Sequence, residues 1–234
     1  MRIAKSFSML VLGLALVTPA HLLAREALFE GLGSHSKKIT TKSPDAQRYF
    51  DQGLAWFHGF HHGAAIRSFQ EAARLDPECA MAHWGIALAN GPHINVPMVP
   101  PPAAEQAWQA ITLAQKFAPR TTPVERALIA AMATRYANPQ PADHSPLDRA
   151  YADALRQLWR TYPKDEDVGV LFAEAMMILR PWELWTADGK AQPGTDEIVA
   201  TLDAVFKINL NHPFANHLYV RDQSDSHDGR RNAG

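Results

Sequence analysis

The chain has 234 residues, of which 47% are hydrophobic and 20% charged, as is typical of a soluble folded domain and not of a disordered or fibrous chain. Its 23 Lys and Arg residues balance 24 Asp and Glu residues, and no long basic run is present, so we expect no nucleic-acid partner. A chain of this length can bury about 70% of the surface that its unfolded form exposes. It therefore needs neither a disulfide nor a metal ion in order to fold.

Residues 1–24 have the parts of a secretory signal peptide. Arg2 and Lys5 precede an apolar run from Phe7 to Val17, and small residues two positions apart follow that run. The run is shorter than the about 20 residues that a membrane-spanning helix needs. We therefore expect an exported protein, periplasmic or secreted, with no membrane contact once residues 1–24 are removed. An uncleaved N-terminal anchor is the alternative.

Three hydroxyl residues that precede proline mark helix starts, namely Ser43, Thr122 and Ser145. A hydroxyl oxygen can accept a hydrogen bond from the first turn, and proline fits the first helical position. Glu125 completes a capping box with Thr122. The pattern from residue 43 onward predicts helices at about 44–58, 62–75, 79–90, 103–117, 122–137, 146–162, 166–179, 194–208 and 213–220. No segment alternates as a strand does, so we predict an all-α fold of antiparallel helix pairs.

The first predicted helix pair forms one unit of an internal repeat. Between residues 46 and 77 the chain resembles a tetratricopeptide repeat (TPR) at six positions, which are Gly53, Trp56, Ala65, Phe69, Ala72 and Pro77. Small residues let the two helices approach, aromatic residues fill the space between them, and Pro77 ends the second helix. The pattern recurs more weakly at longer spacing, and the segment 91–102 carries five prolines. We therefore predict a TPR-like α-solenoid over residues 43–220, with a Pro-rich inserted loop.

Four stretches resemble a family of exported bacterial TPR proteins. They are Phe69–Gly85, Gly91–Asn95, Arg180–Trp182 and Asn211–His217. Members of that family are commonly longer and have no assigned activity, so the resemblance implies architecture and export and little chemistry. The family usually continues with Tyr-Ile-His-Ala, whereas this chain reaches Arg221 and a polar segment. We expect a disordered tail at residues 221–234, either natural or left by truncation. In the second case the uncapped last repeat would self-associate.

A protein-binding groove is the first functional hypothesis. In TPR proteins the first helix of each pair lines a concave groove. The apolar and aromatic residues at those positions are Phe50, Leu54, Phe57, Met81, Trp84 and Leu88. Aromatic anchors favour binding of an apolar protein or peptide segment, so we predict an interaction scaffold. The alternative is that these residues pack against the protein's own loop or its missing repeats.

Histidines indicate a competing function in metal binding. Five of them lie in the predicted repeat or at the start of its inserted loop: His58, His61, His62, His83 and His93. Imidazole groups close together can share a transition-metal ion. Glu174, His212 and His217 would complete such a site if the chain folds them together. The alternative function is therefore a metal-binding protein or metal-dependent enzyme that uses His58, His62 and His83, against the plainer interpretation of histidines on an exposed turn.

The single cysteine, Cys79, excludes an intrachain disulfide in any compartment. Its place at a predicted helix N-terminus would lower the pKa of a nucleophilic thiol with His83 as base, whereas a small buried cysteine is the simpler interpretation. The sequence contains no serine-hydrolase, zinc-protease, P-loop or dinucleotide-binding motif. We assign no catalytic residue, and no cofactor besides the transition metal of the alternative function.

Overall fold

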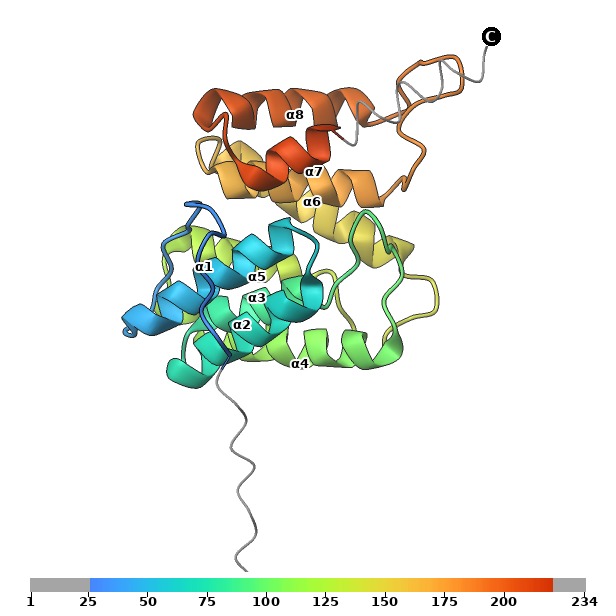
Figure 1. The fold of residues 1–234 in the computed structure, drawn as a ribbon. Helices are drawn as coiled ribbons and strands as arrows, with labels where there is room; N and C mark the ends of the chain where they lie inside the picture. The colour runs from blue at the N-terminus through green and yellow to red at the C-terminus, as the bar shows by residue number, and fades with distance from the viewer. Residues whose placement is uncertain (1–25, 221–234) are drawn as a thin grey trace, which may run out of the picture.

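The computed structural model describes residues 26–220 and is helical over most of that range (Figure 1). Its elements are α1 (Pro44–His58), α2 (His62–Leu75), α3 (Ala80–Ala89), α4 (Pro101–Phe117), the short 3-10 helix η1 (Ala118–Arg120), α5 (Pro123–Ala133), α6 (Ser145–Thr161), α7 (Glu166–Ile178) and α8 (Thr195–Ile208). Residues 213–220 are also helical. Within the described range two isolated bridges form and no strand does, so the all-α prediction is confirmed.

Two predictions fall on residues that the structure does not describe. The signal peptide at residues 1–24 and the polar tail at residues 221–234 both lie outside the described range. Among the described helices, none has both the length and the apolar character needed to cross a membrane.

The helix starts follow the predicted capping chemistry at two of three positions. The Ser43 Oγ accepts the Ala46 N–H at 3.1 Å, and Thr122 forms a complete capping box with Glu125, the third residue of α5. The prediction for Ser145 was wrong by one residue, because α6 begins at Ser145 and its cap position is His144. Asp143 Oδ1 accepts the Ser145 N–H at 3.0 Å, which brings Ser145 itself into the helix.

The Pro-rich loop is shorter than predicted. It covers residues 91–100, and α4 begins at Pro101 where we had expected helix only from residue 103. The missing N–H of a proline costs nothing in the first helical turn, so Pro101 and Pro102 start the helix. The loop is closed by a backbone bridge between His93 and Val96.

Phe69 sets the spacing of the first three helices. A Cβ atom built on Gly53 in α1 or on Gly85 in α3 would lie 2.5 Å from the Phe69 ring, so both positions require glycine for this approach. Ala65 in α2 is also fully buried. The predicted close approach at Gly53 therefore exists, and the ring of Phe69 in α2 is held between its two neighbours.

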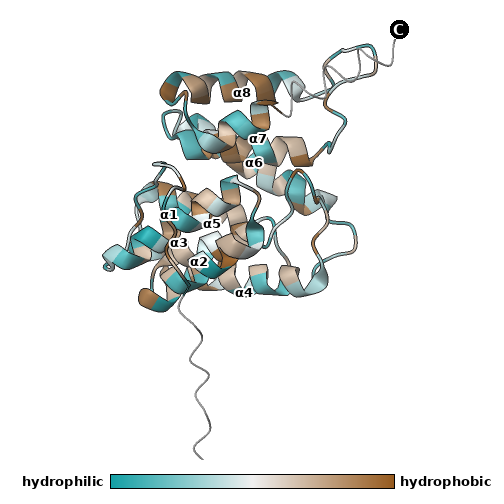
Figure 2. Cartoon of the chain, viewed as in Figure 1, coloured by the Kyte–Doolittle hydropathy of each residue, from teal (hydrophilic) through white to brown (hydrophobic). Residues whose placement is uncertain are grey.

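Each helix packs against the next one in sequence, and α1 also contacts α3 as α3 contacts α5. Figure 1 shows α1 to α5 gathered on one side and α6 to α8 on the other. Hydrophilic and hydrophobic residues are interspersed along α1, α2 and α4 in Figure 2, as expected for helices with one buried and one exposed face. In contrast, α3 and α7 are buried over nearly their whole length.

A non-helical segment that the sequence did not predict precedes α1. Residues 26–43, here named the N-terminal strap, lie along α1 and reach α5 and α7 (Figure 1). The Phe29 N–H donates to Gln52 Oε1 at 2.8 Å, and Thr40 donates from both its N–H and its hydroxyl to Glu125 at 2.6 Å. The strap is therefore fixed to two different helices by side-chain hydrogen bonds.

The end of α8 exposes part of its apolar residues. Ile198, Leu202 and Val205 are buried, whereas Ile208 is 43% exposed and Leu210 is 71% exposed. Burial of the first three follows from packing of α8 on α7, where a Cβ on Gly169 would lie 2.7 Å from Val205. Self-association through this end of the protein stays a prediction.

Candidate metal centre

The six residues of the predicted groove lie in the hydrophobic core. Phe50, Leu54, Phe57, Met81, Trp84 and Leu88 are each at most 4% exposed. Their side chains pack against neighbouring helices, so no partner can reach them in this structure. This corrects the expected groove, because the first helices of the pairs are covered on the face that was expected to be open.

The predicted histidine set also divides into separate groups. His83 lies apart from the others, with Nε2 3.0 Å from the Pro77 carbonyl oxygen and its ring stacked on Phe117. His62 and His93 stack on each other with ring centroids 4.1 Å apart, a face-to-face arrangement that does not direct two nitrogens at one ion. The predicted convergence of His58, His62 and His83 is therefore not what the fold produces.

The remaining predicted residues have other surroundings. His61 is exposed, and its ring packs against Trp56 with centroids 5.5 Å apart. His217 packs against Phe60 with centroids 4.5 Å apart. Within residues 26–220, neither histidine belongs to a group of three potential ligands. Among the described residues, His58 is the one member of the predicted five that belongs to a group of three potential metal ligands.

His58 meets ligand groups from three other parts of the chain. One potential ligand atom each from His35, His58 and Asp167 lies within 4.8 Å of the other two. A second set, made of His35, Glu166 and His212, satisfies the same distance and shares His35. We name these five residues the His-Asp centre. It is assembled by the strap, the end of α1, the first turn of α7 and the segment before residues 213–220.

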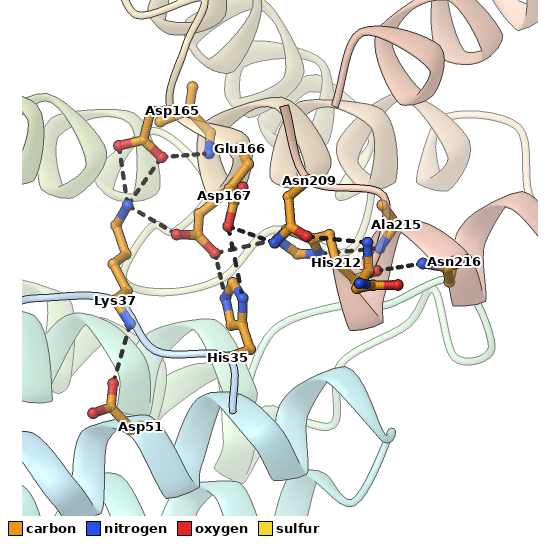
Figure 3. Close-up of polar contacts among 12 residues, drawn as sticks. His35, Lys37, Asp51, Asp165, Glu166, Asp167, Asn209, His212, Ala215 and Asn216 are labelled. Carbon is orange, nitrogen blue, oxygen red and sulfur yellow. Dashed lines mark hydrogen bonds and ion pairs between the residues drawn. The ribbon is translucent and has the colours of Figure 1, made fainter. Parts of the chain in front are cut away.

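Asp167 is the middle of a hydrogen-bonded network that Figure 3 shows. Its Oδ1 lies 2.9 Å from His35 Nε2 and 3.4 Å from His212 Nε2. His35 Nδ1 faces Glu166 Oε1 at 3.8 Å, and Asn209 donates to that same oxygen at 3.0 Å. Two ligands on one tetrahedral ion with bonds of about 2.0 Å are about 3.3 Å apart. His35 Nε2 and Asp167 Oδ1 are hydrogen-bonded at 2.9 Å, so an ion would replace the shared proton and move these two atoms slightly apart.

The local sequence explains how each group is held. Asp165 caps α7 by accepting the Val168 N–H at 3.2 Å, which places Glu166 and Asp167 in the first turn, where carboxylates favour the helix dipole. The His58 ring stacks on Phe214 with centroids 5.1 Å apart. These contacts fix the ring and the carboxylate before any ligand binds.

His212 has a defined tautomer in this network. The Ala215 N–H donates to His212 Nδ1 at 3.3 Å, so Nδ1 is an acceptor and Nε2 carries the proton. The protonated Nε2 is the nitrogen that faces Asp167. His212 therefore donates a hydrogen bond to the Asp167 carboxylate and orients it.

Lys37 from the strap neutralises part of the acidic first turn of α7. Its Nζ donates to both Asp165 oxygens at 3.0 Å and to Asp167 Oδ2 at 3.1 Å (Figure 3). Burial works against the charged ammonium, but Asp167 and Asp165 outweigh it and raise the pKa of Lys37. The ammonium therefore stays charged beside the centre.

The protonation of His58 and Asp167 suits ligation. Burial would lower the pKa of His35, but the hydrogen bond and charge of Asp167, with the charge of Glu166, raise it, so a metal ion would have to displace a proton from this imidazole. Burial, aided by the charge of His35, lowers the pKa of His58 to about 3, so this imidazole is neutral near pH 7. Burial alone would raise the pKa of Asp167, but hydrogen bonds from His212 and His35 and the charge of Lys37 hold it well below the usual range. A neutral imidazole and a carboxylate are the forms that bind metal ions. His58 Nδ1 is buried and has no hydrogen-bond partner.

Two cavities are lined by residues of both the strap and the centre. One of about 680 Å³ is lined by residues 36–38, 124–125 and 161–167, which include Glu166 and Asp167. The other, of about 400 Å³, is lined by residues 28–33 and by His35 and Asp51. The first cavity therefore reaches Glu166 and Asp167 of the centre, and the second reaches His35.

No family model, curated protein or solved structure matches this chain. The resemblance to exported TPR proteins thus receives no support beyond the residues that suggested it. What the centre does has to be argued from its own chemistry.

A second buried polar cluster surrounds Glu174, which the sequence had placed with the histidines. Glu174 lies in α7 and is 3% exposed, and its Oε1 has no hydrogen-bond partner. Burial, only partly offset by the charge of Arg135, raises its pKa to about 7. Arg135 lies over the Tyr151 ring and donates to the Pro92 carbonyl oxygen at 2.9 Å. Glu174 therefore belongs to a separate polar cluster.

Cys79 has the surroundings of an unreactive thiol. Its side chain is buried at the cap position of α3. Burial, with the nearby charge of Asp76, raises the pKa of the thiol to about 11, in contrast with the lowering that a helix N-terminus would give. The nucleophile interpretation is therefore wrong, and the small buried cysteine is the correct one.

Sequence reasoning missed His35, Lys37 and the acidic run Asp165–Asp167. The available signal was the acidic run itself at a predicted helix start, together with a histidine and a lysine in the segment before α1. Such a run usually marks only a solvated helix N-terminus. The run becomes part of a candidate site because the strap lies beside it and supplies His35 and Lys37.

Proposed function

We propose that this protein binds one divalent transition-metal ion through His35, His58 and Asp167. The observation that carries the proposal is the convergence of two imidazoles and a carboxylate from three distant segments, all within 4.8 Å. His58 adds to it, because a buried ring nitrogen without a partner costs about 1–3 kcal/mol and a metal ion would supply that partner.

The ligand chemistry favours ions that accept nitrogen donors. Two imidazoles and one carboxylate suit zinc, iron(II), nickel or copper better than calcium or magnesium. Three protein ligands leave a coordination position open, as in catalytic metal sites. His212 orients Asp167, and Glu166 lies on the far nitrogen of His35, the place where a second carboxylate commonly supports a metal-bound histidine.

The proposal includes the architecture and the compartment expected from the sequence. We take the helices to form a TPR-like α-solenoid, supported by the ring of Phe69 between Gly53 and Gly85 and by the contacts of α1 with α3 and of α3 with α5. Export would place metal loading outside the cytoplasm. Peptide binding through the predicted groove is not carried forward, because its residues are buried.

The test is metal binding by the full chain after treatment with a chelator. We expect one zinc ion per chain by calorimetric titration and a rise in melting temperature, because a ligand at about 100 times its Kd stabilises the native state by about 2.7 kcal/mol. His58→Ala and Asp167→Asn should lose this binding. His61→Ala, which removes an exposed histidine outside the centre, is the matched control. Zinc binding by His58→Ala as tight as by the wild type would refute the proposal.

A further inference from the structure

We infer that Lys37 is the specificity-determining residue of the His-Asp centre, because its ammonium occupies the cation position between Asp165 and Asp167 and so leaves the centre to an ion that accepts imidazole ligands. This inference rests on the proposed function. The inference adds to the proposed metal binding a reason why ions that prefer oxygen ligands, such as calcium and magnesium, are excluded.

The contacts of Lys37 are those of a bound cation. Three oxygens from two carboxylates surround its Nζ, at 3.0, 3.0 and 3.1 Å. The side chains of Lys37 and Asp167 are 11% and 12% exposed, and that of Asp165 is 22% exposed. In Figure 3 the ammonium lies between the two carboxylates, on the side of Asp167 opposite to the histidines. A hard cation would need the same oxygens.

The two oxygens of Asp167 therefore have different partners. Its Oδ2 is held by Lys37, whereas its Oδ1 faces His35 and His212. One carboxylate oxygen beside imidazoles is a nitrogen-rich site for a transition metal. Without the ammonium, Asp165, Glu166 and Asp167 would offer three carboxylates in sequence, and calcium takes six to eight oxygen ligands of that kind.

The strap prevents Lys37 from moving away. Its backbone N–H donates to Asp51 Oδ1 at 3.1 Å, and its backbone carbonyl accepts from Gln47 Nε2 at 2.9 Å. Both partners lie on α1. A fixed backbone and a buried ion pair keep the ammonium in place, so the oxygen-rich position is permanently filled.

If Lys37 only stabilised the fold by holding the strap on α7, it would make the same contacts. A measurement of metal preference distinguishes that structural role from the specificity role. The experiment measures zinc and calcium affinity by calorimetry for the wild type, for Lys37→Met and Lys37→Gln, and for the exposed neighbour Lys38→Met as control. We expect the ratio of zinc to calcium affinity to fall by about tenfold or more in both Lys37 variants, because ligand charge sets calcium affinity. The ratio in Lys38→Met should equal that of the wild type.

The outcomes distinguish this inference from the proposed function. An unchanged ratio in the Lys37 variants, with zinc still bound, overturns the inference and leaves the metal centre standing. Failure of the wild type to bind zinc overturns both. If a Lys37 variant is unfolded without metal, its circular dichroism is followed while calcium is added. Refolding on addition of calcium, with no refolding in buffer that lacks divalent cations, supports the inference. A variant that stays unfolded in calcium refutes it.

Discussion

Replacement of Glu174 by glutamine should remove a pH dependence of stability that the wild type has. Glu174 is buried in the middle of α7, its Oε1 has no partner, and its pKa is raised to about 7 because burial outweighs the attraction of Arg135. In the unfolded chain the same carboxyl has its ordinary pKa of 4.5. The native state therefore holds a proton that the unfolded state releases between these two values.

The sign and the size follow from this difference. Stability from Glu174 is fully present below pH 4.5 and is lost as the pH rises through about 7, since the unfolded chain can ionise there and the buried carboxyl resists ionisation. Each pH unit between the two values is worth about 1.36 kcal/mol, so the loss is about 3 kcal/mol. That is a large part of the about 5–15 kcal/mol that usually stabilises a folded domain.

The assay is urea unfolding at several values between pH 4.5 and 8, for the wild type, for Glu174→Gln and for the exposed control Glu183→Gln. The free energy of unfolding of the wild type minus that of Glu174→Gln should fall by about 3 kcal/mol across the range. Contributions from all other titrating groups cancel in this difference. Glu183→Gln should follow the wild type.

A pH profile of Glu174→Gln that runs parallel to that of the wild type would refute the reasoning. It would mean that Glu174 ionises in the native state as easily as in the unfolded chain. The cause would then be a partner for its Oε1, or closer compensation by Arg135 than the structure contains.

Three further outcomes follow from the packing and the capping. Gly85→Ala should lower the free energy of unfolding by about 1–3 kcal/mol in chemical denaturation, because its Cβ would lie 2.5 Å from the Phe69 ring; an unchanged midpoint would show that the ring can move aside. Ala65→Leu should lose a similar amount through overpacking, which a melting curve equal to that of the wild type would contradict. Cys79 should react with a thiol reagent at pH 7 only after denaturant is added, because its pKa is about 11; rapid labelling of the native protein would disprove this.

The helices could be predicted because their signals are local. Ser43, Thr122 and the prolines that follow them act within one turn, so the sequence alone located the starts of α1 and α5. The error at Ser145 has a local cause too, since Asp143 competes for the cap. The contact of Phe69 with Gly53 could be predicted because the two residues belong to one helix pair.

The centre could not be predicted in the same way, because its parts interact only in three dimensions. His58 was singled out from its own neighbours, but its partners come from the strap and from α7. The strap has no periodic pattern, and its position depends on single hydrogen bonds such as that of Thr40 with Glu125. His62 follows His58 by one turn and His83 was grouped with both by residue type alone, yet His62 stacks on His93 and His83 on Phe117.

The place of the strap in the chain also determines when the centre can form during synthesis. His35 leaves the ribosome early, while its partner Asp167 lies 132 residues further on. At about 5–20 residues per second, the strap waits many seconds before α7 exists to receive it. Contacts so distant in sequence are slow to form because a long loop has to close first. The first described segment of the protein is thus among the last to reach its final partners, and completion of the centre reports that α1 and α7 have both folded.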